Sequence, residues 1–188
     1  MQKLLITATA LLLTLAGCKK DTEVLTGKTH KTAQGGISYC GNTQQVDLLA
    51  GQTTNIGNVT VGNDENFLYV TYQATGSWYF TELHLFVGDC DSKPVNKAGN
   101  PVPGQFPYQT AFASPYSQSY TFVIPLSDLP ACYCVAAHAA TIKKNAKGGV
   151  AQSETAWGNG IRFVPKGNWG MYFNSCKQDC SDCGLPEC

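Results

Sequence analysis

Glu82 and His84 are the residues best suited to chemistry in this chain, because they combine a carboxylate with an imidazole two positions apart. Alternate residues of a β-strand point to the same face, so these side chains are expected to lie side by side. His138 occupies another segment with strand character. If the two strands are neighbours, His84, His138 and Glu82 form a zinc or copper site or an acid–base pair. The alternative is that both histidines are hydrogen-bonded, half-buried residues of the sheet.

The aromatic residues predict a second kind of site, a surface that stacks on sugars. Trp157 and Trp169 each precede a glycine, which leaves a flat ring beside a residue without a side chain. Such rings stack on the apolar faces of sugars, while amide side chains contact the hydroxyl groups. The residues expected to bind a ligand are Trp157, Trp169, Tyr108, Tyr116 and Trp78. The alternative is that these rings fill the core.

The rest of the chain offers little for catalysis, and no catalytic residue is predicted. The sequence has no Gly-x-Ser-x-Gly motif and no glycine-rich phosphate loop, and nothing places a base beside Ser153. The carboxylates are too scattered to indicate a glycosidase pair. Residues 63–66 and the pair Asp89 and Asp91 offer oxygen ligands for calcium, although a solvated turn is the simpler explanation of both. No cofactor is expected beyond such a calcium or zinc ion.

Eight cysteines besides Cys18 predict a disulfide framework, because an even number in an exported chain indicates disulfides. They are Cys40, Cys90, Cys132, Cys134, Cys176, Cys180, Cys183 and Cys188. In a strand, Cys132 and Cys134 point to the same face, so each is expected to bond a different partner. The last four have zinc-like spacing, which export makes the weaker interpretation. The connectivity stays open.

Segments rich in aromatic and β-branched residues, separated by Gly, Pro and Asn turns, predict an all-β fold. The expected strands are residues 53–61, 66–74, 78–87, 120–124, 132–142 and 169–175. A helix is the alternative for the alanine-rich residues 131–140. The regular spacing of the strands indicates an antiparallel β-sandwich of the jelly-roll or immunoglobulin-like type, with disulfides and a Cys-rich C-terminal tail.

Residues 78–87 show the strict alternation of a half-buried strand. The alternation places Tyr79, Thr81, Leu83, Leu85 and Val87 on one face and Trp78, Phe80, Glu82, His84 and Phe86 on the other. The Pro-rich stretch 89–118 is too long for a hairpin and is predicted to be a long loop that carries binding residues.

Several short blocks of the body are similar to blocks shared among secreted microbial proteins of unknown function. They are residues 82–88, 99–106, 136–139, 154–160 and 167–173, within the range 46–175. This resemblance implies a common fold and no particular activity.

The N-terminal residues have the pattern of an export signal. Lys3 precedes a short apolar run that ends in the residues Leu-Ala-Gly-Cys at 15–18, and this run falls short of the roughly 20 residues that span a bilayer. These residues resemble the lipobox of bacterial lipoproteins, which implies removal of residues 1–17 and lipidation of Cys18. The alternative is an ordinary secretory signal followed by a structural cysteine. Lysine at position 19 implies the outer membrane, with the domain facing the periplasm or the outside.

The expected division of the chain into segments follows from this export signal. It comprises a signal peptide (1–17), a lipidated flexible tether (18–38), a β-sandwich domain (39–175) and a Cys-rich tail (176–188). The membrane is therefore an expected partner through the N-terminal lipid.

Composition limits the other partners. The chain has 13 basic and 13 acidic residues and a net charge of +0, so it lacks the basic surface of a nucleic-acid-binding protein. We expect a lipid-anchored, non-catalytic module that binds carbohydrate or another cell-surface ligand. The alternatives are a structural or interaction subunit of an outer-membrane assembly, and a metal-binding or metalloenzyme domain that uses His84 and His138.

Overall fold

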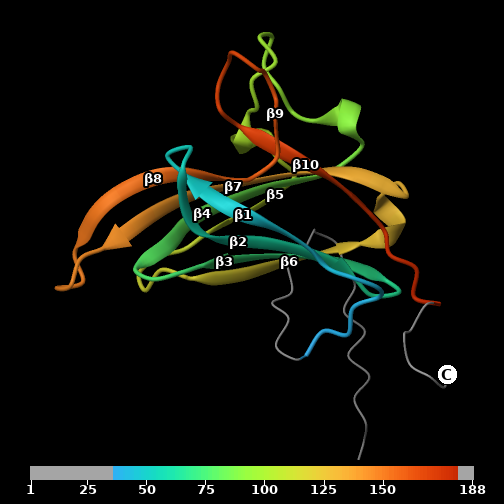
Figure 1. Cartoon of the computed structure of the whole chain (residues 1–188), viewed down its shortest axis with the longest axis horizontal. Coiled ribbons are helices and arrows are strands. Elements are labelled where there is room, and N and C mark those ends of the chain that lie inside the picture. The colour runs from blue at the N-terminus through green and yellow to red at the C-terminus, as the bar shows by residue number, and fades with distance from the viewer. Residues whose placement is uncertain (1–35, 182–188) are drawn as a thin grey trace, which may run out of the picture.

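The regular structure consists almost entirely of β-strands, as the aromatic and β-branched composition of its segments predicts. The structure, a computed structural model, describes residues 36–181 (Figure 1). Its strands are β1 (Gln44–Ala50), β2 (Thr54–Asn63), β3 (Phe67–Ala74), β4 (Trp78–Gly88), β5 (Tyr108–Ala111), β6 (Ser119–Pro125), β7 (Cys132–Lys144), β8 (Val150–Gly158), β9 (Ile161–Arg162) and β10 (Met171–Cys176). The short 3-10 turns are η1 (Cys90–Ser92), η2 (Pro103–Gln105) and η3 (Leu126–Asp128). Within residues 36–181, no helix has the length and hydropathy needed to cross a membrane.

The paired strands are antiparallel, and their hydrogen-bonded order is β5-β4-β7-β8-β1-β2-β3-β6. β10 lies beside the first residues of β7, and β9 pairs with β10. The edge strands β5 and β6 approach each other through side chains, with 6.5 Å between the ring centroids of Tyr108 and Phe122. The prediction of an all-β antiparallel fold is confirmed, and the sheet nearly closes around one core (Figure 1).

The inner face of this sheet encloses the main core. Leu68, Val70 and Tyr72 alternate along β3 and are each 0% exposed. Full burial of a large apolar side chain contributes roughly 1.5–3 kcal/mol. The Tyr72 ring makes edge-to-face contacts with Phe80 of β4 and Phe122 of β6. Rings from three strands therefore interlock across the core and hold the curved sheet together.

A β-bulge between Phe80 and Glu82 changes which side chains of β4 face the core. A bulge inserts one extra residue into a strand, so the alternation shifts by one position across it. Trp78 and Phe80 therefore lie on the inner side together with Leu83, and all three belong to the main core. The strict alternation expected for β4 is wrong before the bulge, where Tyr79 rather than Trp78 is the more exposed residue.

The outer face of β4, β7 and β8 carries a second, smaller apolar cluster. This outer cluster consists of Phe86, Phe106, Cys134, Ala136, Trp157 and Met171. Segments 89–107 and 159–170 lie above this face, at the top of Figure 1. Gly170 allows the close contact, because a Cβ atom there would clash with Pro101 and lie 3.1 Å from the Trp157 ring. Part of the predicted loop 89–118 thus covers the sheet, through Phe106.

Three disulfides staple the described residues. They are Cys40–Cys180, Cys90–Cys134 and Cys132–Cys176. The prediction that Cys132 and Cys134 bond different partners is confirmed, because both side chains leave the same face of β7. Disulfides rather than a zinc ion account for Cys176 and Cys180. Cys183 and Cys188 lie outside the described residues.

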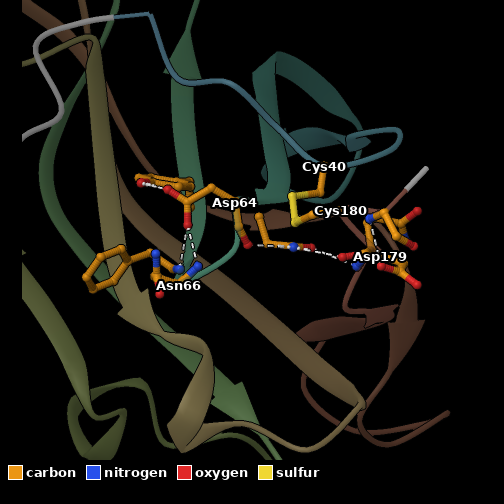
Figure 2. The surroundings of a disulfide bond; sticks show 10 residues. Cys40, Asp64, Asn66, Asp179 and Cys180 are labelled. Carbon is orange, nitrogen blue, oxygen red and sulfur yellow. Dashed lines mark hydrogen bonds between the residues drawn. A yellow bond between two sulfur atoms is a disulfide. The ribbon is translucent and has the colours of Figure 1, made fainter. Parts of the chain in front are cut away.

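The Cys40–Cys180 disulfide joins the two ends of the described chain beside the turn that contains Asp64 and Asn66 (Figure 2). Asn63 is 1% exposed and holds both ends. Its amide nitrogen donates to the Gln178 carbonyl at 3.0 Å, and its amide oxygen accepts from the Gln178 N–H at 2.7 Å. The Asn63 carbonyl accepts from the Cys40 N–H. This arrangement satisfies a buried polar side chain that would otherwise destabilise the fold.

Four strands lie outside the expected segments, namely β1, β5, β8 and β9, and one expected strand for which a helix was the alternative is confirmed. The alanine-rich segment forms β7 rather than a helix. β5 lies inside the Pro-rich stretch and has four residues. β8 is polar and largely exposed over its first half, so it lacks a clear apolar alternation. The predicted signal peptide, Cys18 and the tether up to residue 35 lie outside the described residues.

Candidate functional site

The register of β4 and β7 places His84 directly opposite His138. Both project from the outer face, because their neighbours Leu83 and Ala139 point into the main core. Residues directly opposite in an antiparallel pair have Cβ atoms about 4.5–5.5 Å apart. The sequence left open whether the two histidines meet, and the structure brings them together as a histidine pair.

The two imidazole rings meet through their Nδ1 atoms, which lie 3.2 Å apart. Oε1 of Glu82 lies 3.3 Å from Nε2 of His84, on the other side of that ring. Because a carboxylate accepts hydrogen bonds, the proton of His84 belongs on Nε2. Nδ1 of His84 then accepts the Nδ1–H of His138. This proton assignment follows from the partner of each nitrogen atom.

Rigid elements surround the histidine pair on several sides. His84 and His138 are 7% and 8% exposed, whereas the Glu82 side chain is 49% exposed. Trp157 of β8 lies opposite His138, with 4.8 Å between the ring centroids. From the core side, the Tyr72 hydroxyl donates to the backbone carbonyl of His84 at 3.2 Å. The pair is therefore held in one arrangement, and Glu82 connects it to solvent.

Burial, followed by the influence of nearby His84, lowers the pKa of His138 from 6.5 to about 3. The charged imidazolium is disfavoured because few polar groups replace its lost hydration. His138 is therefore neutral at ordinary pH. Neutral imidazole is the form that ligates metal ions.

The spacing of the pair fits two nitrogen ligands on one metal ion. Two Zn–N bonds of about 2.0–2.1 Å at a tetrahedral angle place their nitrogens roughly 3.3 Å apart, close to the observed 3.2 Å between the Nδ1 atoms. Glu82 was expected as a third ligand, but it contacts the far nitrogen of His84. It thus occupies the place of a carboxylate that orients a ligating histidine. Among residues 36–181, no group of three or more His, Cys, Asp or Glu side chains is arranged to hold a metal ion.

The structure separates the aromatic residues that were expected to bind a sugar. Trp157, Trp78 and Tyr108 are 3%, 7% and 7% exposed, and their rings pack inside the two apolar clusters. Rings at that exposure have no face open to a ligand in this structure. Trp169 is partly buried against the outer cluster. Tyr116 is partly exposed and lies near the start of β4, where Lys144 contacts both Tyr116 and the β4 ring of Tyr79.

The two candidate calcium segments are turns whose carboxylates accept protein donors. Asp64 accepts from the N–H groups of Asn66 and Phe67 at 2.8 and 2.7 Å and from the Tyr69 hydroxyl at 2.6 Å. Burial alone would raise the pKa of Asp64, but these hydrogen bonds hold that pKa below its ordinary value. Asp89 accepts from a backbone N–H at the start of η1 in the same way. Both carboxylates therefore order local turns.

The residues that position the histidine pair carry no local sequence signal. Tyr72 reaches His84 from β3, and Trp157 reaches His138 from β8. Each contact joins separate strands, so no motif or spacing reveals it. The glycine after Trp157 instead predicted an exposed ring that stacks on sugars.

Comparisons with known proteins do not assign this chain to a family. No family model, no curated protein and no solved structure matches it. Its function must therefore be argued from the geometry of the site.

Proposed function

We propose that this protein is an exported, lipid-anchored domain that binds one transition-metal ion through the Nδ1 atoms of His84 and His138. The observation that carries the proposal is the 3.2 Å separation of these two nitrogens on adjacent strands. Zinc and copper are the ions whose ligand preferences suit two neutral imidazoles. The ion replaces the hydrogen that the two nitrogens share.

Binding of the ion requires both Nδ1 atoms to be free of protons. His84 carries its proton on Nε2, so its Nδ1 is already free to bind an ion. His138 must move its proton from Nδ1 to Nε2, which releases no net proton. Glu82 accepts from Nε2–H of His84 and thereby fixes the tautomer and raises the basicity of the ligating nitrogen. Two protein ligands leave coordination positions for water or for groups of a partner, which suits a carrier better than a closed structural site.

Two observations support export and anchoring. The three disulfides are typical of an oxidising compartment. The resemblance of residues 15–18 to a lipobox supports an acyl anchor on Cys18. A Cys18→Ser variant is expected to leave the membrane fraction and appear as soluble exported protein. Continued recovery of this variant in membranes, after a high-salt wash, would contradict the anchor.

Metal titration of the purified chain tests the site. Zinc and its spectroscopic substitute cobalt are expected to bind with a stoichiometry of one. Glu82→Gln is expected to weaken binding by roughly 10–100-fold, as loss of an outer-shell partner usually does. His84→Gln and His138→Gln are expected to weaken it further, because each removes a ligand. Isothermal titration calorimetry and the visible spectrum of bound cobalt measure both effects.

The third histidine of the chain provides the matched control, since His30→Gln leaves the pair intact. Circular dichroism and the three disulfides report whether each variant folds. The proposal fails if the unaltered chain takes up neither ion. It also fails if a folded His84→Gln variant binds as tightly as the unaltered chain.

A further inference from the structure

One end of the sheet carries a cluster of lysines and tyrosines that the histidine site does not use. This distal patch consists of Tyr79, Tyr116, Lys143, Lys144 and Lys147. Tyr79 lies near the start of β4, and Lys143 and Lys144 end β7. Lys147 lies in the hairpin between β7 and β8, and Tyr116 precedes β6. Three segments distant in sequence therefore meet at this end.

Cation–π contacts link the charged and aromatic members of the patch. Nζ of Lys144 lies 4.3 Å from the ring centroid of Tyr79 and 5.6 Å from that of Tyr116. On the opposite face of β7, Nζ of Lys143 lies 5.8 Å from the ring centroid of the buried Trp78. Such contacts attract an ammonium group to the face of the ring, so they restrict where the ammonium groups lie. A ligand anion thus meets cations that are already positioned beside aromatic rings.

The backbone of the patch is ordered by hydrogen bonds. The Lys144 N–H donates to the Ser77 carbonyl at 2.9 Å, which ties the end of β7 to the start of β4. Oδ1 of Asn145 accepts from the N–H groups of Lys147 and Gly149 at 2.9 and 3.0 Å. The β7–β8 hairpin that presents Lys147 therefore has a fixed shape. Ordered sites bind more tightly because less conformational entropy is lost on binding.

Positive charge predominates at this end. Residues 74–80, 112–119 and 143–153 contain three lysines and no aspartate or glutamate, and the acidic residue that follows on β8 is Glu154, whose Oε1 accepts from the Gln152 amide opposite Lys143. The whole chain has a net charge of +0, so this end is more positive than the chain as a whole. A local field of this kind attracts anionic partners.

The patch lies far from the point where the N-terminal segment joins the sheet. β7 runs from Cys132, which is bonded to Cys176, to Lys144 over 13 residues, or roughly 40 Å at the rise of a β-strand. Cys40 lies at the Cys176 end, through Asn63 and Gln178. In Figure 1 the β7–β8 hairpin is at the left and the chain after β10 is at the right. The patch therefore lies at the end of the domain opposite Cys40.

We propose that the distal patch binds an acidic polysaccharide that crosses the end of the sheet, where its sugar rings lie against Tyr79 and Tyr116 and its carboxylates pair with Lys144 beside those rings and with Lys143 on the opposite face of β7. Uronic acid polymers combine both chemistries, because each ring has an apolar C–H face and a carboxylate at its edge. Ammonium groups bind carboxylates through charge-assisted hydrogen bonds. Tyrosine rings stack on sugar faces while their hydroxyl groups contact sugar hydroxyls.

Binding of the whole chain to soluble polygalacturonate tests the inference at physiological ionic strength. The unaltered chain is expected to bind polygalacturonate and not dextran, a neutral glucan. Lys143→Gln/Lys144→Gln is expected to raise the Kd by about tenfold, through loss of two exposed charge pairs. The matched control is Lys97→Gln/Lys166→Gln, which removes two exposed lysines elsewhere and is expected to leave the Kd unchanged.

A second variant separates sugar recognition from charge alone. Tyr116→Ala is expected to weaken polygalacturonate binding several-fold while leaving binding of polyglutamate, an acidic polymer without sugar, unaltered. The inference fails if polygalacturonate does not bind, or if the control lysine pair matters as much as Lys143 and Lys144. Equal affinity for polyglutamate, duplex DNA or vesicles of anionic lipid would also overturn it, since charge alone would then explain the binding.

Discussion

Replacing Trp157 by alanine is expected to lower the free energy of unfolding by about 3–5 kcal/mol, the usual cost of removing a buried tryptophan. The indole is 3% exposed and forms the centre of the outer cluster. Its ring contacts Phe106 and Phe163, with centroids 6.2 and 6.1 Å away, and lies against His138. These contacts join the sheet to both segments that cover it, so the cavity cannot close without moving them.

Urea denaturation followed by circular dichroism measures this effect. Trp169→Ala is the matched control, because Trp169 packs at the margin of the same cluster and is partly exposed. Its loss is expected to cost clearly less than the loss of Trp157. A Trp157→Ala variant within about 1 kcal/mol of the unaltered chain would show that the outer cluster does not stabilise the fold. The same variant is expected to loosen the histidine pair and weaken metal binding.

Removal of the Cys40–Cys180 disulfide by Cys40→Ser/Cys180→Ser is expected to cost about 3–5 kcal/mol. This bond closes a loop of sequence separation 140, the longest of the three disulfides. In the chain-entropy account, a longer closed loop removes more freedom from the unfolded chain. The bond also anchors the two ends that Asn63 holds by hydrogen bonds.

Cys132→Ser/Cys176→Ser provides the comparison, because that bond closes a separation of only 44 and joins strands already paired in the sheet. The entropy difference between the two loops corresponds to about 1 kcal/mol. Thermal and urea unfolding of both double variants measure it. A larger loss from the Cys132–Cys176 pair would show that contacts in the native sheet, rather than loop length, decide the contribution of each disulfide.

The strand content of this chain could be predicted from sequence, because aromatic and β-branched residues alternate in the strands that have one buried face. β2, β3, β4, β6, β7 and β10 agree with the predicted segments within a few residues. β8 was not predicted, because its first residues are exposed on both faces and therefore show no apolar alternation. β1 and the two-residue β9 also lie outside the predicted segments, and β5 is short and lies among prolines. Local sequence carries a signal where burial is one-sided and carries little where it is not.

The bulge in β4 shows why the direction in which a side chain points is harder to predict than the strand that carries it. A single inserted residue at Thr81 reverses the parity of everything before it. Trp78 thereby moves into the main core and ceases to be available for stacking, while Tyr79 takes the exposed position beside Lys144. No glycine or proline in this segment marks the bulge, which is visible only in the pairing of β4 with β7.

The sequence by itself determined the strand composition, the use of disulfides and the residue types capable of metal chemistry. The tertiary structure decided which of these residues meet. His84 and His138 are 54 positions apart and face each other solely because of the β4–β7 register. The same register brings Tyr79 and Lys144 to one end of the sheet, and the bridge between Phe80 and Ser117 adds Tyr116 there. Pairing between distant strands depends on core packing and turn geometry across the whole chain, so short-range patterns do not encode it.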